Sequence, residues 1–235
     1  MSIIAESEAV PELAAFGIRA FTTTRASGSF GFMTDEPVRD VTARWAQLRR
    51  ELRSRGPRLA TATQVHGVNV LVHHPGWEGW LRADEADGHV AVERGTALAV
   101  TVADCVPVFI AHPSGAIALL HSGWRGTAAG IVAHGITVLE QRGVRASELR
   151  LHTGPAICGD CYEVSGDVYA QLTGTNPGGP RTIDLRALIA DQARARGVTH
   201  ISTSASCTRC DNDRFYSHRA GDAGRQLGVM IADPP

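Results

Sequence analysis

Apolar residues along this chain fall into short runs rich in β-branched side chains, a pattern typical of β-strands. Several runs are apolar at successive positions, which predicts strands buried on both faces. The predicted strands are 17–24, 59–64, 68–72, 97–103, 106–111, 116–120, 150–153 and 229–232.

Apolar residues at helical spacing predict four helices, mostly at the flanks and in the second half of the chain. The first has Asp40 as its N-cap, carries its apolar residues on one face and ends at Gly56. The others run from near Thr127 to Gly143, begin at Ser165, and run from Asp184 to Gly197. This order favours an α+β fold, a mixed sheet covered by helices, over a regular βαβ alternation.

Length and composition indicate one soluble domain. The 235 residues, 43% of them hydrophobic, suffice for a substantial core, and we interpret residues 1–235 as a single catalytic domain. The net charge of −1 gives no electrostatic reason to expect nucleic acid or an anionic membrane, so the expected partner is a small molecule. The start of the chain lacks the pattern of a signal peptide, and the apolar region 97–112 is too short to span a membrane. A cytoplasmic location is therefore expected.

All 23 basic residues are arginine. A Schiff-base lysine, a lysine general base and a phosphate-loop lysine are therefore excluded. Any phosphate or carboxylate must be held by arginine or by backbone N–H groups. The five cysteines, an odd number, favour free thiols or metal ligands over a disulfide framework.

Three potential metal ligands follow predicted strands, namely His66, Cys105 and His121. If these strands are neighbours in one sheet, their ends converge on a single rim. Two imidazoles and a thiolate suit zinc, and three protein ligands leave a fourth position open for chemistry. Their spacing matches no compact zinc motif, and each residue also has an ordinary structural interpretation as a turn histidine, a buried thiol or a core histidine.

Six short strings occur in a fixed order between about Phe21 and Ile231. They are QVHG at 64–67, ADG at 86–88, ADCVPV at 103–108, HSGWRG at 121–126, GP at 154–155 with CYEV at 161–164, and FYSHR at 215–219 with GR at 224–225. Together they resemble the YfiH-type family, which is also labelled polyphenol oxidoreductase or laccase and, later, purine nucleoside phosphorylase.

The resemblance implies a four-layer α-β-β-α sandwich, similar to toxin cysteine-hydrolase domains, with zinc bound by His66, Cys105 and His121. It also implies phosphorolysis of adenosine, inosine and methylthioadenosine, and deamination of adenosine. A water activated by zinc suits attack at the purine C6 position, whereas phosphorolysis needs a phosphate held near the ribose. Zinc is then the cofactor, and a nucleoside and phosphate are the partners.

Arginines are the candidates for holding the phosphate. Arg125 lies just before the helix predicted at Thr127, so its guanidinium and the N-terminal amides of that helix could bind the anion together. Arg25 and Arg219 are further candidates, although each is equally consistent with a surface group.

Catalysis is assigned to Cys105, His121 and Arg125. Two acidic residues close to the predicted ligands have roles as well, and the first, Asp87, is assigned a substrate contact at the edge of the site. Asp104 points away from Cys105 and is expected to orient a ligand or a loop.

Two stretches depart from the family pattern. Residues 31–35 lack its Ser-x-Asn-Leu segment, so a substrate contact there is in doubt. The paired arginines of the family appear here as His218 and Arg219, which weakens one cationic contact.

Four further cysteines form two CxxC pairs, Cys158 with Cys161 and Cys207 with Cys210. Such pairs ordinarily indicate zinc, but 45 residues separate Cys161 from Cys207, against about 15–20 in compact zinc ribbons. Four buried thiols are the favoured interpretation, and a structural zinc or a labile disulfide are the alternatives.

Other functions stay open. Cys105 paired with His121 could be the nucleophile of an amide hydrolase that edits cell-wall precursors. A metal-stabilised interaction module without enzymatic activity is another alternative. A copper oxidase is disfavoured, because multicopper enzymes need many histidine ligands and the other eight histidines form no HxH pattern.

Overall fold

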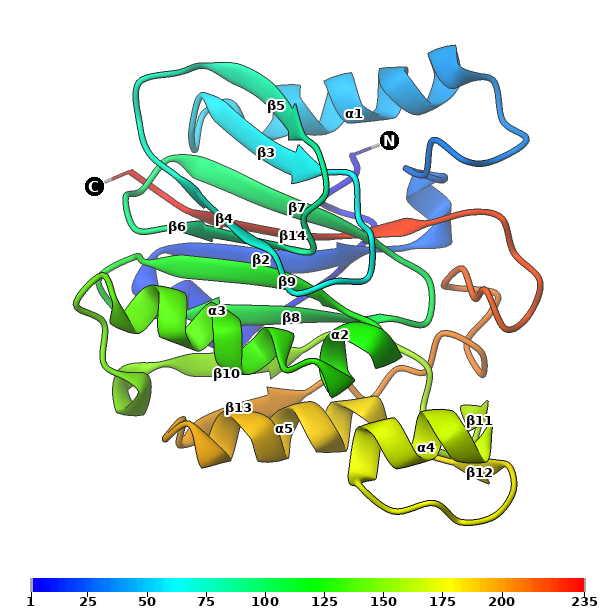
Figure 1. Ribbon diagram of the computed structural model, residues 1–235. Helices are drawn as coiled ribbons and strands as arrows, with labels where there is room; N and C mark the ends of the chain where they lie inside the picture. Colours follow the sequence, from blue (N-terminus) through cyan, green and yellow to red (C-terminus); the bar gives the residue numbers. More distant parts are fainter. Residues whose placement is uncertain (1, 235) are drawn as a thin grey trace.

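The structure, a computed structural model, describes residues 2–234 and contains two six-stranded sheets packed face to face (Figure 1). The first sheet has the order β1 (Ser7–Ala9), β2 (Ile18–Thr23), β14 (Gln226–Ala232), β7 (Thr96–Val102), β3 (Arg58–Ala62) and β5 (Gly79–Ala83). The second has the order β13 (His200–Thr203), β10 (Arg150–Thr153), β8 (Val106–Ala111), β9 (Ile117–Ser122), β6 (Gly88–Ala91) and β4 (Val70–His73). A small hairpin-like pair, β11 (Glu163–Val164) and β12 (Arg181–Thr182), lies outside both sheets.

Both large sheets are mixed. In the first, β3 is parallel to β5 and β7, while the remaining pairs are antiparallel. In the second, β10 is parallel to β13 and β4 is parallel to β6. The α+β class with mixed sheets is therefore confirmed.

Helices cover the two outer faces (Figure 1). α1 (Val38–Leu52) packs on the first sheet, whereas α2 (Trp124–Ala128), α3 (Ile131–Glu140) and α5 (Leu185–Ala195) lie against the second. α4 (Gly166–Thr173) contacts α2, and short 3-10 turns occupy Pro11–Phe16, Arg25–Ser27 and Ala146–Glu148. The resulting layers are the α-β-β-α sandwich that the resemblance implies.

Three hydrophobic layers explain why the central strands contain long apolar runs. In β8, Val108 and Ile110 face the helices of the second sheet, while Phe109 and Ala111 enter the layer between the sheets. Side chains of a strand alternate between its faces, so a strand covered on both sides must be apolar throughout. None of the helices within residues 2–234 has the length and apolarity that crossing a membrane requires.

Two helix predictions are wrong in detail. The N-cap of α1 is Pro37, and Asp40 lies inside the first turn, where its charge favours the helix dipole. The helix predicted from Thr127 to Gly143 is two helices, because Gly130 adopts the left-handed conformation (φ 80°) between α2 and α3. The side-chain cap predicted at Asp184 is confirmed, since its carboxylate accepts hydrogen bonds from the first turn of α5. The helix start predicted at Ser165 is also confirmed, because Ser165 is the N-cap of α4.

Candidate active site

The three predicted metal ligands come together at the rim where the two sheets meet. His66 lies in the loop between β3 and β4, Cys105 in the turn between β7 and β8, and His121 near the end of β9. Their ligand atoms all lie within 4.8 Å of one another. The three strands are not neighbours in one sheet, because β3 and β7 belong to the first sheet and β9 to the second. The turn at Cys105 carries the chain from one sheet to the other, and so joins the two rims.

Cys105 interacts with both imidazoles, and the pKa of its thiol depends on them. Burial raises the pKa of the thiol, but the neighbouring His121 and His66 outweigh burial and lower that pKa to about 6. For His121, burial opposes protonation, yet the Cys105 thiolate and the Asp87 carboxylate raise its pKa to about 9. In the metal-free protein Cys105 is therefore a thiolate at neutral pH, the form that binds a metal and attacks electrophiles.

Asp87 supports two of the ligands from behind. Its fully buried carboxylate accepts hydrogen bonds from the backbone N–H groups of Val65, His66 and Gly67, at 3.1, 3.0 and 2.7 Å. The same carboxylate pairs with Nδ1 of His121 at 2.7 Å, which directs Nε2 of that ring away from Asp87.

The bonds from Asp87 also stabilise an uncommon backbone conformation, because His66 has a φ of 60°. Burial disfavours ionisation of Asp87, but the bonds to His121 and to the loop outweigh it and lower the pKa of the carboxyl. The substrate contact predicted for Asp87 is not supported, because its carboxylate does not reach the cavity that the ligands line.

Asp104 orients loops, as predicted. Its carboxylate accepts a hydrogen bond from Thr208 Oγ1 at 2.6 Å and another from the backbone N–H of Arg219 at 2.7 Å. Its carbonyl oxygen accepts from the N–H of Ile157 at 3.2 Å. Three distant segments are thereby fastened to the turn that presents Cys105.

Gly123 leaves room for the ligands. A Cβ atom at this position would lie 2.8 Å from Cys105 Sγ and 3.1 Å from His66 Cδ2. We expect Gly123→Ala to displace both side chains and to weaken metal binding by at least about tenfold. Metal titration of the purified variant measures this, with Gly179→Ala as a control, because nothing lies within 4 Å of a Cβ built there. Unchanged affinity in Gly123→Ala would contradict the packing described here.

A cavity of about 420 Å³ opens beside the three ligands, all of which line it. This volume lies within the range typical of small-molecule sites. One wall is aromatic, formed by Phe30, Phe32 and Trp45. Its polar lining includes threonines, Gln64, Arg82, His218 and Arg225.

The aromatic wall combines stacked rings with one edge-to-face contact, in which Phe30 meets Trp45 at 5.4 Å and 84°. Phe32 is parallel to Trp45, with centroids 6.4 Å apart and an interplanar angle of 2°, and Trp45 stacks on Trp80 at 4.9 Å. The Arg82 guanidinium lies 4.5 Å over the Phe32 ring. Residues 31–33 thus line the cavity even though the segment departs from the family pattern.

The arginines predicted to hold phosphate lie elsewhere. Arg125 belongs to α2, its guanidinium lies 4.4 Å over the ring of Trp124, and it lines a separate hollow of about 360 Å³. Arg25 forms an ion pair with Asp222 at 2.7 Å. The Arg219 guanidinium lies 5.1 Å over the ring of Tyr162. None of the three lines the 420 Å³ cavity, so their roles stay predictions that the geometry does not support.

The arginines that do line the cavity are Arg82 and Arg225, and the His218 imidazole lines it as well. Two of them lie in strings that support the family resemblance, so motif position was the available signal for His218 and Arg225. Arg82 belongs to no such string, and only the folded chain brings it to the site.

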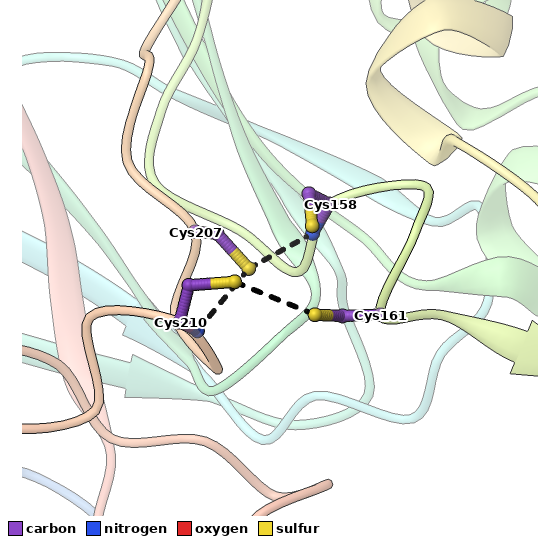
Figure 2. Close-up of side chains that lie close together, drawn as sticks. All are labelled: Cys158, Cys161, Cys207 and Cys210. Carbon is purple, nitrogen blue, oxygen red and sulfur yellow. Dashed lines mark hydrogen bonds between the residues drawn. The ribbon is translucent and has the colours of Figure 1, made fainter.

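The two CxxC pairs also converge. The ligand atoms of Cys158, Cys161, Cys207 and Cys210 lie within 4.8 Å of one another, and their side chains point toward a common centre (Figure 2). The favoured interpretation of four buried thiols is wrong, because Cys210 is exposed and only Cys207 is buried. Residues 2–234 therefore contain two groups of side chains that could hold a metal ion.

Comparison with known proteins identifies relatives along nearly the whole chain. The family described as multi-copper polyphenol oxidoreductase laccase has a model that matches residues 19–233. The purine nucleoside phosphorylase ORF3 of Streptomyces griseus is 35% identical over 178 residues, which cover 72% of each chain. The purine nucleoside phosphorylase Rv2149c of Mycobacterium tuberculosis is 34% identical over 231 residues, which cover 91% of each chain.

Solved structures share the fold. YlmD from Geobacillus stearothermophilus superposes with a TM-score of 0.86 at 28% identity over 94% of both chains. The hypothetical protein YfiH from Bacillus licheniformis also has a TM-score of 0.86, and at 22% identity it supports the fold alone.

Proposed function

Since the chain belongs to the multi-copper polyphenol oxidoreductase laccase family, we propose that it is a zinc-dependent purine nucleoside phosphorylase that also deaminates adenosine. Its substrates would be adenosine, inosine and methylthioadenosine together with phosphate, used in the cytoplasm. One observation carries the proposal: a three-ligand group lines a cavity of small-molecule size. The relatives named purine nucleoside phosphorylase support the choice of reaction.

The donor set fits zinc. Zinc bonds of about 2.0–2.3 Å in tetrahedral geometry place the ligand atoms roughly 3.3–3.6 Å apart, which is compatible with a group whose atoms lie within 4.8 Å. His66, Cys105 and His121 would hold the ion, and Asp87 would fix the orientation of His121. When bound, zinc supplies an electrophile and lowers the pKa of water.

The cavity walls can bind the rest of the substrate. A purine can stack on the wall formed by Phe32 and Trp45, since flat π-systems favour offset stacking. In phosphorolysis the glycosidic C–N bond breaks with its electron pair passing to the base, and a C1′–O bond to phosphate forms. In deamination water attacks C6 and ammonia leaves.

Substitutions of Arg225 and Arg125 show which of these two arginines binds phosphate. We expect Arg225→Met to raise KM for phosphate roughly tenfold, because Arg225 lines the cavity and its guanidinium, which donates to the carbonyls of residues 222–224, would also donate to a bound phosphate. Arg125→Met is the matched comparison, since Arg125 stacks on Trp124 outside that cavity. Steady-state kinetics at varied phosphate measure both. A larger effect in Arg125→Met would restore the assignment made from sequence.

Chromatography of adenosine, inosine and methylthioadenosine incubated with zinc-loaded protein and phosphate tests the proposal. Free base that forms only with phosphate present supports phosphorolysis, and inosine formed from adenosine supports deamination. If neither free base nor inosine is released, the proposed function is wrong.

A second candidate is a cysteine hydrolase that acts on an amide. The observation in its favour is the lowered pKa of Cys105 beside His121, an arrangement that also activates nucleophilic thiols. Chelation separates the two candidates, because a nucleophilic cysteine keeps its activity without metal and a zinc site loses it.

Alkylation of the metal-free protein measures the thiol directly. The pKa of Cys105 is lowered from 9.0 to about 6, so the thiolate is its main form at neutral pH. Iodoacetamide labelling of the Cys105 peptide should therefore rise through about pH 6 and level off above pH 7. Added zinc should suppress it. Labelling that keeps rising to about pH 9 would show that the imidazoles do not stabilise the thiolate.

Copper oxidation fits this chain poorly despite the family description. The two ligand groups within residues 2–234 contain two histidines in total, whereas several copper ions need many more. Oxidation of a phenol that depends on added copper would overturn this view.

A further inference from the structure

We propose that Cys158, Cys161, Cys207 and Cys210 bind a second zinc ion, which holds two loops together and takes no part in the chemistry. Figure 2 shows the four side chains meeting from two separate loops, with each CxxC pair contributing one half of the group. This inference is independent of the reaction proposed above, because none of the four residues lines the 420 Å³ cavity.

The long interval between the pairs follows from the topology. β10 and β13 are parallel neighbours, so the loops that follow them leave the same end of the sheet. Parallel strands require a long crossover, and here the crossover contains α4 and α5. Beyond the strands the loops remain side by side, through a β-bridge between Ala156 and Cys207 and a hydrogen bond from Thr208 N–H to the Ala156 carbonyl at 3.1 Å. The 45 intervening residues therefore do not argue against a shared site.

The sulfur positions suit a tetrahedral tetrathiolate. Zinc–sulfur bonds of about 2.3 Å place neighbouring sulfur atoms roughly 3.8 Å apart. The Sγ atoms of Cys161 and Cys210 are 3.5 Å apart, and all four cysteines are free thiols within a 4.8 Å group. The backbone N–H groups of Cys158 and Cys210 lie 3.3 and 3.5 Å from Cys207 Sγ, as donors to a charged sulfur ligand do.

The surroundings suit the charge and the role of such a site. Four thiolates around Zn²⁺ carry a net negative charge, and Arg209 lies within the second pair and donates to the Cys161 carbonyl at 3.2 Å. Four protein ligands close the coordination sphere, which is the arrangement of structural zinc.

The ion would fasten a segment that has little regular structure of its own. No helix or strand lies between β13 and β14, and the chain there contains Thr208 and Arg219. Both hold the carboxylate of Asp104, the neighbour of Cys105. A second zinc would therefore keep the turn that presents Cys105 in place from outside the active site.

Metal content per chain tests the proposal. Protein prepared under reducing conditions with zinc should contain two zinc ions, and both Cys105→Ser and Cys210→Ser should contain one. Cys210 is the preferred position because its side chain is exposed, so serine there disturbs the core least. X-ray absorption of the zinc retained by Cys105→Ser should show sulfur ligands alone.

Several outcomes would overturn the proposal. These are one zinc in the wild type with none in Cys105→Ser, iron in place of zinc at the second site, or a Cys161–Cys210 disulfide in protein kept reduced. If Cys210→Ser does not fold, the metal content of the wild type and of Cys105→Ser still decides. Loss of phosphorolysis with two zinc ions present would contradict only the proposed function.

Discussion

Replacing Cys105 with serine should remove the metal from the active site and lower kcat/KM by at least about a thousandfold, equal to roughly 4 kcal/mol of activation free energy. The thiolate is the only sulfur ligand of its group, and a serine hydroxyl does not ionise at neutral pH. The variant should stay folded, because its turn is held by the hydrogen bonds of Asp104 and by the strands on either side.

Kinetics, metal content and thermal melting of Cys105→Ser together separate three functions. Inactive, folded protein that lacks this metal supports a catalytic site. Unfolded protein would support the metal-stabilised interaction module instead. Full activity without the metal would exclude both the zinc enzyme and the cysteine nucleophile.

Asp87→Asn should weaken metal binding by about 10–100-fold and lower the free energy of unfolding by about 3 kcal/mol. The carboxylate accepts from three backbone N–H groups and from His121, and an asparagine side chain can offer only one oxygen to these donors. Its NH₂ group would face a donor, and the His66 loop would lose part of its support.

Denaturant unfolding of the metal-free protein and metal titration measure the two effects of Asp87→Asn. Asp191→Asn is the matched control, because Asp191 forms an exposed ion pair with Arg194 and should change stability by less than about 0.5 kcal/mol. If Asp87→Asn behaves like the control in both measurements, the supporting role of Asp87 is wrong.

The central strands could be predicted from the sequence because each is covered on both faces by other parts of the chain. The expected bounds 106–111 match β8, where a continuous apolar run is forced by the two layers of packing. The expected bounds 150–153 match β10, in which only Leu151 is apolar. The strands β1, β5, β6 and β13 were not predicted. Three of them lie at sheet edges, where a short, partly polar sequence such as His200–Thr203 carries no periodic signal.

The site was only partly predictable. Motif order selected His66, Cys105 and His121, which the structure brings into one group. The cavity wall joins Phe32, Trp45 and Arg82 from separate elements, and no local sequence pattern predicts that they meet. The sequence also could not predict where the Arg125 side chain points. Its guanidinium stacks on the ring of the neighbouring Trp124, and that contact depends on side-chain packing. The spacing of the two CxxC pairs does not reveal their metal site, because 45 residues separate Cys161 from Cys207, unlike in a compact zinc ribbon. The parallel crossover between β10 and β13 accounts for this interval.

Removal and replacement of the metal show directly whether His66, Cys105 and His121 hold a catalytic zinc ion. Phosphate-dependent release of adenine from adenosine is followed in protein stripped by chelation and then titrated with zinc, beside Cys105→Ser treated in the same way. We expect stripping to abolish the reaction and zinc to restore it in the wild type, whereas zinc should restore nothing in Cys105→Ser. Undiminished adenine release from the stripped wild type would contradict a catalytic metal at His66, Cys105 and His121.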